Sequence, residues 1–418
     1  MEVLFITHKY PPSIGGMEKQ SYELINGVAE NHPVHTLIYD NKTSKLKFFL
    51  SVFFKVRRML KQHPDISIIH VNDGLMAIFA FLLKRITNVP ILVTIHGLDI
   101  VFPSSFFQRW VVKQFKKLDG VIAVSQATAM ECLKRGFDND KVFVVRNGVD
   151  TDLKNIYKQL DYKKQLENRI GLNLSGKKIL VSVGRSVRRK GFSWFIKKVM
   201  PQLDDNTIYL IIGPPQRHIK KINIFLKLLP KKLAHNISLL LGLPIDAIEI
   251  QEALGKPEVK GKAFYLGKLP FEEMAQVLKH SDLFIMPNIK VNGDAEGFGL
   301  VALEAAICGL PVLASAIEGI TDAVIDGKNG VLAPSGKETE WVRMINDLLR
   351  DTQSLKKFGK ESQKYTIKNY DWKKMVSGYV AVFNKFNEKA HEVHETKVMK
   401  EASFNDDFEL ESIAVYAK

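Results

Sequence analysis

The sequence predicts an α/β protein with two Rossmann-like domains, each built on a parallel sheet that helices cover on both faces. The chain of 418 residues is long enough for two domains with a core in each. Short apolar runs rich in β-branched residues alternate with helical patterns along both halves, which is typical of parallel sheets. A polar, charged stretch at 155–175 separates the two series, and we interpret it as a helical linker.

The bulk composition narrows the class of protein. Hydrophobic residues make up 46% and charged residues 25%, as in ordinary globular proteins. Cys132 and Cys308 are too few for a disulfide framework or a metal knuckle, which favours a reducing, intracellular setting. The N-terminus enters a strand without a signal-peptide pattern, and no apolar run reaches the length of a membrane span. The net charge of +15 indicates an anionic partner: nucleic acid, a phosphorylated ligand or an anionic membrane face.

The first strand, 2–7, is followed by a loop that ends in Gly15 and Gly16, and then by a helix. The spacing is not G-x-G-x-x-G, so a dinucleotide fingerprint is absent. The glycine pair fits a plain tight turn, or a loop that lets a ligand approach the backbone; its place after a strand favours the second. His96 also follows a strand, 91–95, and fits a structural role as well as one in hydrogen bonding or proton transfer.

The remaining elements continue the alternation. In the first half we expect strands at 34–39, 66–71, 120–125 and 142–145 and helices at 45–61, 75–85, 106–118 and 127–135. In the second half we expect strands at 178–183, 207–212, 262–266, 282–286 and 311–315, with helices from 338 onward.

Basic residues crowd the loop after the strand 178–183. Arg185, Arg188, Arg189 and Lys190 fall within six positions between two glycines. Surface basic residues are usually only solvated, but this density at the tip of a strand favours phosphate binding.

A second candidate site begins at Glu296. Gly297 and Gly299 keep the backbone open at the start of a predicted helix, where free N–H groups and the positive end of the dipole can hold an anion. Glu304 lies about two turns further on. Taken alone, the stretch fits equally well a capped core helix with two solvated glutamates.

Two segments combine basic and apolar residues without any acid. The first, 42–61, contains Phe48, Phe49, Phe53 and Phe54, and we interpret it as a basic amphipathic helix with exposed aromatic residues, a candidate for lying on an anionic membrane. The alternative is a helix that packs on the sheet and needs an apolar face anyway. The segment 216–235 has the same character and is a second candidate membrane surface or a partner site.

These motifs stand in one order along the chain: Gly15-Gly16, His96-Gly97, 147–150, the basic loop at 184–191, and Glu296 with Glu304. From Met1 to about Phe386 the chain resembles the retaining glycosyltransferases of the GT-B fold, family 4. The resemblance implies two domains that face a central cleft. The acceptor-binding domain is expected at 1–165 and the nucleotide-sugar-binding domain at 166–368. A helix at 369–386 is expected to cross back to the N-terminal domain. The polar remainder, 387–418, predicts a weakly ordered tail.

The resemblance also implies roles for single residues. Arg185 and Lys190 would hold the donor diphosphate, Glu296 the donor sugar and Glu304 the ribose. His96 and Glu296 would lie at the reacting sugar, without Glu296 acting as a covalent nucleophile. The donor-binding set is Gly15, Gly16, Arg185, Lys190, Glu296, Gly297, Phe298, Gly299, Leu300 and Glu304. No metal or other cofactor is implied, because these cations and a helix start suit the charge that develops on a diphosphate leaving group.

The expected activity is transfer of a hexose from a nucleoside-diphosphate sugar to a hydroxyl acceptor, with retention of configuration. The acceptor would be a glycan or lipid-linked precursor in cell-envelope or polysaccharide synthesis. The protein is expected in the cytoplasm, peripheral on the inner face of the membrane.

A nucleotide-sugar epimerase is the nearest alternative function. A nucleic-acid-binding protein would explain the charge but lacks a recognition pattern, and an NAD-dependent oxidoreductase lacks its fingerprint. The D-x-D patterns at 138–140 and 150–152 are interpreted as loops. The segment 213–264 is longer and more basic than the family's usual connection, which leaves the donor base open. The loop 288–295 is also longer than the common form, and its Asn292 or Asp294 is a candidate to touch the donor sugar.

Overall fold

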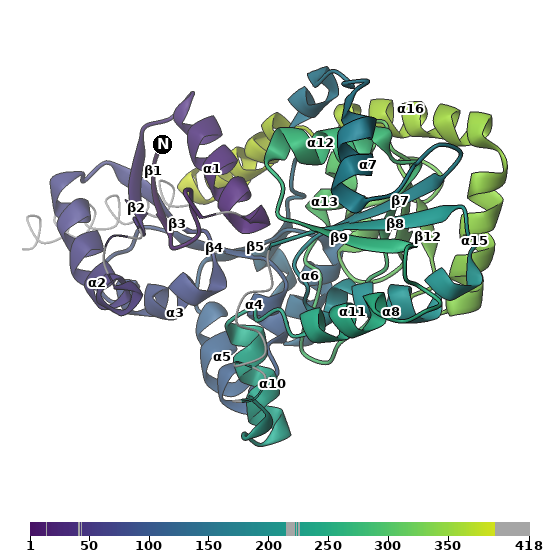
Figure 1. Cartoon of the computed structure of the whole chain (residues 1–418). Coiled ribbons are helices and arrows are strands. Elements are labelled where there is room, and N and C mark those ends of the chain that lie inside the picture. The colour runs from purple at the N-terminus through teal and green to yellow at the C-terminus, as the bar shows by residue number, and fades with distance from the viewer. Residues whose placement is uncertain are drawn as a thin grey trace, which may run out of the picture. The chain divides into compact units, whose positions relative to one another are not determined.

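The computed structural model describes residues 1–13, 15–40, 42, 44–214, 222, 224 and 226–388. It contains two six-stranded sheets, ordered β2-β1-β3-β4-β5-β6 and β12-β11-β10-β7-β8-β9 (Figure 1). Strand pairs with a defined register run parallel. The predicted α/β class with two parallel sheets is therefore confirmed. The tail from 389 and residues 216–221, 223 and 225 of the second basic segment lie outside the described residues.

The first sheet is formed by the N-terminal third of the chain. Its strands are β1 (Glu2–Thr7), β2 (Val34–Ile38), β3 (Ile66–Val71), β4 (Ile91–Ile95), β5 (Gly120–Ala123) and β6 (Val142–Val144). The helices between them are α1 (Gly16–Ala29), α2 (Lys45–Gln62), α3 (Gly74–Leu83), α4 (Leu98–Val101), a π-helical turn (Phe107–Val111) with α5 (Val112–Phe115), and α6 (Gln126–Lys134). Every residue of β4 is buried, as expected for a strand covered on both faces.

The second sheet follows α7 (Tyr162–Ile170). Its strands are β7 (Lys178–Val183), β8 (Thr207–Ile212), β9 (Ala263–Gly267), β10 (Leu283–Met286), β11 (Val312–Ser315) and β12 (Val331–Ala333). The helices are α8 (Phe192–Lys198), α10 (Lys231–Leu240), α11 (Asp246–Leu254), α12 (Phe271–His280), α13 (Leu300–Ile307), α14 (Ile320–Ala323), α15 (Glu338–Arg350) and α16 (Thr352–Asn369).

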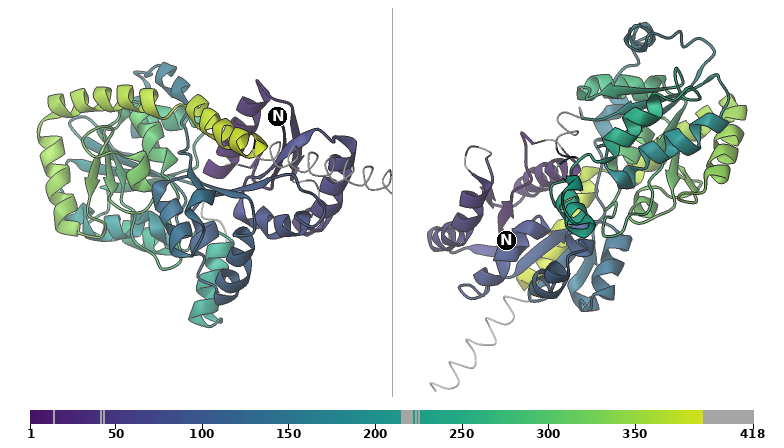
Figure 2. Two further views of the ribbon diagram at one scale, coloured as in Figure 1. Left: turned by 180° about the vertical axis from the view of Figure 1, so that it is seen from behind. Right: turned by 60° about the horizontal axis from the view of Figure 1, so that its bottom comes forward.

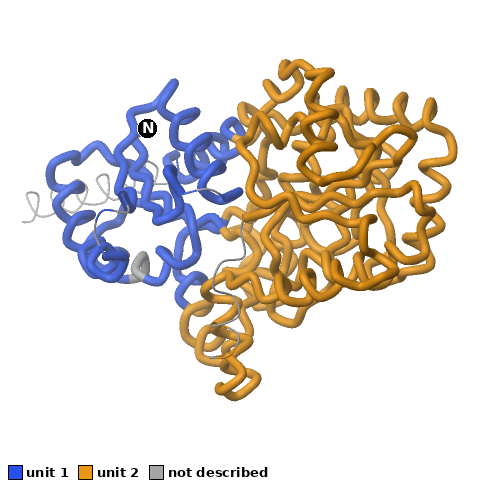
Figure 3. Tube along the Cα trace, viewed as in Figure 1, with its two compact units in different colours: residues 1–94, 114–121, 376–418 blue, residues 95–113, 122–375 orange. Residues whose placement is uncertain are grey.

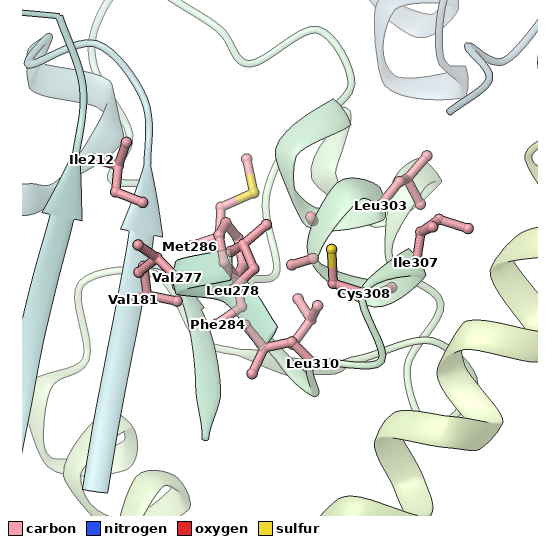
Figure 4. Packing of buried hydrophobic residues seen from close by; sticks show 14 of the residues in the cluster. Val181, Ile212, Val277, Leu278, Phe284, Met286, Leu303, Ile307, Cys308 and Leu310 are labelled. Carbon is pink, nitrogen blue, oxygen red and sulfur yellow. The ribbon is translucent and has the colours of Figure 1, made fainter. Parts of the chain in front are cut away.

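Alternate residues of these strands point to opposite faces and form two apolar layers. On β7, Val181 belongs to a layer shared with α7, α12 and α13, whereas Leu180 belongs to one shared with α8, α11 and α15. Figure 1 shows α12 and α8 on opposite sides of the strands, and Figure 4 shows side chains of the first layer. Tyr162 and Leu166 of α7 are buried in that layer, so the charged stretch 155–175 contributes to the core of this sheet.

The described chain divides into two compact units (Figure 3). The first comprises residues 1–94, 114–121 and the chain from 376, and the second comprises 95–113 and 122–375. The last described helix, 372–388, is drawn in yellow-green in Figure 2. Within the first unit its Tyr379 hydroxyl lies 3.1 Å from Gln20 Nε2 and 3.0 Å from Thr94 Oγ1. The predicted return of a C-terminal helix to the N-terminal part of the fold is confirmed.

The motif at 147–150 anchors the start of this helix. The N–H of Val149 donates to the carbonyl of Tyr370 over 2.6 Å. A Cβ added at Gly148 would lie 2.6 Å from both N and Cα of Trp372. Only glycine permits this approach of two backbones.

Helix α2 presents two different faces. Phe48, Val52 and Val56 are buried, and the ring of Phe48 packs 5.4 Å from that of Tyr39. The expectation that the aromatic residues of this helix are exposed is therefore wrong for Phe48, which covers the sheet. The outer face instead exposes Leu46 by 67%, Leu50 by 63% and Phe54 by 70%.

Candidate functional site

The loop after β7 turns its four basic side chains in two directions. Arg185 and Arg188 are exposed, and they reach the long connection between β8 and β9. Arg185 Nη1 lies 3.5 Å from the carbonyl of Gly242, and Arg188 Nη2 lies 3.1 Å from Glu249 of α11. In contrast, Lys190 is only 8% exposed. The crowded loop is thus divided between a surface pair and an inward pair.

The inward pair, Arg189 and Lys190, meets the loop that follows β10. Lys190 Nζ lies 2.8 Å from Glu296 Oε2, and Arg189 Nε lies 3.3 Å from the same oxygen. Arg189 Nη1 also donates to both carboxylate oxygens of Asp294 at 3.1 Å. Asn288 Nδ2 completes the ring of donors around Glu296 Oε2 at 3.0 Å. Strands β7 and β10 are neighbours in the sheet, so their carboxyl ends bring the basic and acidic loops together.

Glycine makes this approach possible. Gly191 has φ of +68°, and a Cβ added there would lie 1.9 Å from the carbonyl oxygen of Pro287 at the end of β10. Any larger residue would separate the two loops.

The charges of the cluster fix its protonation. Burial opposes ionisation of Glu296, but Lys190 and Arg189 outweigh it and lower the pKa of Glu296 to about 2. Burial lowers the pKa of Lys190, while its contact with Glu296 opposes this effect. Glu296 is therefore a carboxylate at neutral pH and is unsuited to act as a general acid.

The helix predicted after Glu296 is α13. Its N-cap is Gly299, with φ of +107°, and Glu304 lies in the second turn with a partly buried side chain. Phe298 is buried, with its ring 6.2 Å from that of Tyr370, so it anchors the loop to the core.

The structure also brings His96 beside this loop. A Cβ added at Gly297 would lie 1.9 Å from the carbonyl oxygen of His96. The N–H of His96 donates to Asp99 Oδ2 over 2.9 Å. Gly15 and Gly16 belong to the first unit, at the start of α1.

Sequence reasoning singled out Lys190 and Glu296 but not their partners. Arg189 was only one of a basic quartet, Asp294 was considered as a sugar contact but not as a partner of Arg189, and Asn288 was an unassigned polar residue of a long loop. A third acid was missed: the N–H of Glu296 donates to Glu318 Oε2 over 2.6 Å. Nothing in the local sequence around Glu318 signals this contact.

A second buried titratable pair, in the first unit, was also missed. His8 follows β1 and Asp73 follows β3, and His8 Nδ1 lies 3.0 Å from Asp73 Oδ1. Burial opposes ionisation of Asp73, but hydrogen bonds and the charge of His8 outweigh it and lower its pKa. Asp73 also caps α3 by accepting from the N–H of Met76 over 2.9 Å. An Asp immediately before an apolar helical run is a sequence signal for a helix N-cap, and this signal could have drawn attention to Asp73.

Among the described residues, no group of three or more His, Cys, Asp or Glu side chains is arranged to hold a metal ion. No helix in the same part of the chain is long and apolar enough to cross a bilayer.

Two family models match successive parts of the chain. The model described as "Glycosyltransferase Family 4" matches residues 2–153, and "Glycosyl transferases group 1" matches residues 163–365. The chain belongs to glycosyltransferase family 4. The two matches cover both sheets of this glycosyltransferase.

Curated relatives and solved structures agree with this assignment. An uncharacterized glycosyltransferase of Methanocaldococcus jannaschii is 27% identical over 68% of this chain and 62% of its own length. A GDP-mannose-dependent α-(1-6)-phosphatidylinositol monomannoside mannosyltransferase of Mycolicibacterium smegmatis is 21% identical over 89% of this chain and 95% of its own. The Anabaena protein HepE, solved in complex with UDP and glucose, has a TM-score of 0.70 at 18% identity and covers 92% of this glycosyltransferase and 100% of its own chain. These similarities support the GT-B fold.

Proposed function

We propose that this glycosyltransferase moves a sugar from a nucleoside-diphosphate sugar to a hydroxyl acceptor, with retention of configuration and without a metal ion. The observation that carries the proposal is the Lys190–Glu296 pair, held at the carboxyl ends of β7 and β10. This is the edge at which parallel sheets bind nucleotides. HepE, which has the same fold, was solved with UDP and glucose, in line with a donor of this class.

The leaving group of such a transfer is a nucleoside diphosphate on which negative charge grows. Arg185 and Lys190 lie on one loop, and the open start of α13 lies on another. Cations and a helix N-terminus stabilise developing charge on phosphate oxygens without a metal ion. Lys190 is already paired with Glu296, so a bound diphosphate shares this cation with the carboxylate.

Glu296 acts as a fixed carboxylate in this proposal. With its pKa near 2, it accepts hydrogen bonds from sugar hydroxyls and favours positive charge on the sugar ring in the transition state. His96 is proposed to lie at the reacting sugar, in keeping with the contact of its backbone with Gly297. Glu304 is proposed to bind the ribose and the Gly15-Gly16 loop to approach the donor phosphates.

The acceptor is proposed to be a glycan or lipid-linked precursor of cell-envelope or polysaccharide synthesis, used at the cytoplasmic face of a membrane. The mycobacterial relative named above acts on a phosphatidylinositol mannoside. Helix α2 supports a peripheral position, because Leu46, Leu50 and Phe54 recur every four residues on its exposed face. The basic side chains of α2 are Lys45, Lys47, Lys55, Arg57, Arg58 and Lys61, and the helix has no acidic residue. An apolar stripe among cations suits an anionic lipid surface.

The test is turnover of a panel of nucleotide sugars with and without candidate acceptors. Wild type is expected to release nucleoside diphosphate from at least one donor, faster with an acceptor, and Lys190→Ala is expected to lose this activity. Lys197→Ala is the matched control, because Lys197 pairs with Glu249 and lies outside the site. If the sugar is epimerised without release of nucleotide, the epimerase alternative replaces transfer. If no donor is consumed, the proposal is wrong.

A further inference from the structure

Glu318 combines an unfavourable backbone conformation with a position at the donor site. Its φ is +51°, and in the part of the chain that the structure describes it is the one non-glycine residue with positive φ. Such a conformation is costly for a residue with a long side chain and persists where the surroundings impose it. Glu318 follows β11, so the ends of β7, β10 and β11 contribute Lys190, Glu296 and Glu318 in turn.

The side chain of Glu318 and the backbone of Gly319 both bind the main chain of Glu296. Glu318 Oε2 accepts the N–H of Glu296 over 2.6 Å, and the N–H of Gly319 donates to the carbonyl of Glu296 over 3.1 Å. A Cβ added at Gly319 would lie 2.0 Å from the carbonyl oxygen of Gly297. The turn at 318–319 therefore fixes the backbone of the loop that contains Glu296 and Gly297.

An unsatisfied acceptor lies in the same cluster. Asn288 is 1% exposed, and its Nδ2 donates to Glu296 Oε2. Its Oδ1 is buried and has no hydrogen-bond partner among the described residues. A buried acceptor without a donor is costly, and it is typical of a site that a ligand completes. Asn288 Oδ1 and the Glu318 carboxylate both accept hydrogen bonds, so both suit a ligand group that donates them.

We infer that Glu318 is a specificity-determining residue of the donor-sugar subsite, where its carboxyl group binds a hydroxyl or amino group of the donor sugar. This inference rests on the proposed function. Asp294 and Glu296 are paired with the cations Arg189 and Lys190, whereas Glu318 forms no ion pair among the described residues. Glu318 therefore makes the subsite favour neutral or amino sugars over sugars that carry a carboxylate. The inferred contact is with the donor sugar and not with the nucleotide.

The experiment is isothermal titration of wild type, Glu318→Gln and Glu318→Gly with UDP, GDP, UDP-glucose, UDP-N-acetylglucosamine, GDP-mannose and UDP-glucuronic acid. The Gln variant keeps the side-chain length and removes the charge, and the Gly variant removes the side chain and with it the backbone strain of the positive φ. Thr321→Ala is the control, since Thr321 Oγ1 bonds only the carbonyl of Glu318 in this turn. Circular dichroism and thermal melting confirm that each variant is folded.

The expected result distinguishes binding of the nucleotide from binding of the sugar. Both Glu318 variants bind the bare nucleotide as wild type does, but lose about tenfold in affinity for the preferred nucleotide sugar, the scale of one hydrogen bond to a charged group. Their discrimination against UDP-glucuronic acid falls, while Thr321→Ala behaves as wild type. If the wild-type protein binds no nucleotide sugar, the proposed function is wrong. If the wild-type protein discriminates between sugars and the Glu318 variants discriminate equally well, only the inference about Glu318 is wrong.

Discussion

Lys190 Nζ lies 2.8 Å from Glu296 Oε2, although the two residues belong to loops that follow different strands, and their side chains are only 10% and 12% exposed. Removing one member of a buried ion pair leaves the other charge uncompensated, which destabilises more than removing both. Lys190, which we propose to stabilise the leaving group, therefore also stabilises the folded protein.

Lys190→Met is expected to lower transfer by about 100-fold and the free energy of unfolding by about 3 kcal/mol, because Glu296 loses its nearest cation. The double variant Lys190→Met/Glu296→Gln is expected to recover most of the stability but not the activity. Denaturant unfolding and initial rates measure the two effects. Lys197→Met, which breaks a half-exposed pair, is the control and is expected to cost less than about 1 kcal/mol. Full activity in Lys190→Met would contradict the donor-site assignment.

The two glutamates of the site predict opposite effects of pH on stability. Burial, with the charges of Glu296 and Asp294, raises the pKa of Glu318 to about 7, while the N–H of Glu296 and the charge of Arg189 oppose the rise. Its stabilising contribution is complete below its ordinary pKa of 4.5 and is lost as pH rises through 7. Glu296, with its pKa near 2, contributes above 4.5 and loses that contribution as pH falls toward 2.

The effect of Glu318 on stability is measured from the unfolding midpoints of wild type and Glu318→Gln between pH 5 and 8. Wild type is expected to lose stability relative to Glu318→Gln as pH rises across this range. Parallel pH profiles of the two proteins would show that Glu318 does not titrate there.

Gly148→Ala is expected to lower the free energy of unfolding by about 2 kcal/mol, because its new Cβ would meet the backbone of Trp372. The melting temperature measures this. The matched control is Gly171→Ala, which also lies in a loop but has no atom within 4 Å of an added Cβ. Its left-handed φ of +68° still imposes a cost, so equal losses in the two variants would remove the contact with Trp372 as the cause.

Leu46→Ser/Leu50→Ser/Phe54→Ser is expected to weaken binding to vesicles containing anionic lipid by about tenfold or more, since three exposed apolar side chains are lost. Vesicle sedimentation measures the binding, with zwitterionic vesicles for comparison. Phe48→Ser is the contrasting variant, because Phe48 is buried and its loss should destabilise the fold. Unchanged binding by the folded triple variant would exclude α2 as the membrane surface.

Much of the fold could be predicted because parallel strands buried on both faces leave long apolar runs such as β4 and β8. The two faces of α2 were also readable, since Leu46, Leu50 and Phe54 follow one helical stripe and Phe48, Val52 and Val56 another. The error at Phe48 came from treating the aromatic run as one surface.

The partners within the site could not be predicted in this way. The pairing of Lys190 with Glu296 joins residues 106 positions apart, through strands that only the folded sheet makes neighbours. Glu318 is a greater departure from local rules, because positive φ is typical of Gly, Asn or Asp and no propensity argument places a Glu there. Its conformation follows from contacts with Glu296 and Gly297, which sequence patterns do not contain.

The most direct test of the donor site is calorimetric titration of wild type, Lys190→Ala and Glu304→Ala with UDP-glucose, GDP-mannose and the corresponding nucleoside diphosphates. Wild type is expected to bind at least one nucleotide sugar. Lys190→Ala is expected to weaken both nucleotide and nucleotide sugar by about tenfold or more, since a phosphate contact is lost. Glu304→Ala is expected to do the same, and Lys197→Ala is expected to bind as wild type does. Undiminished binding by folded Lys190→Ala and Glu304→Ala, or the failure of wild type to bind any nucleotide, would contradict the account.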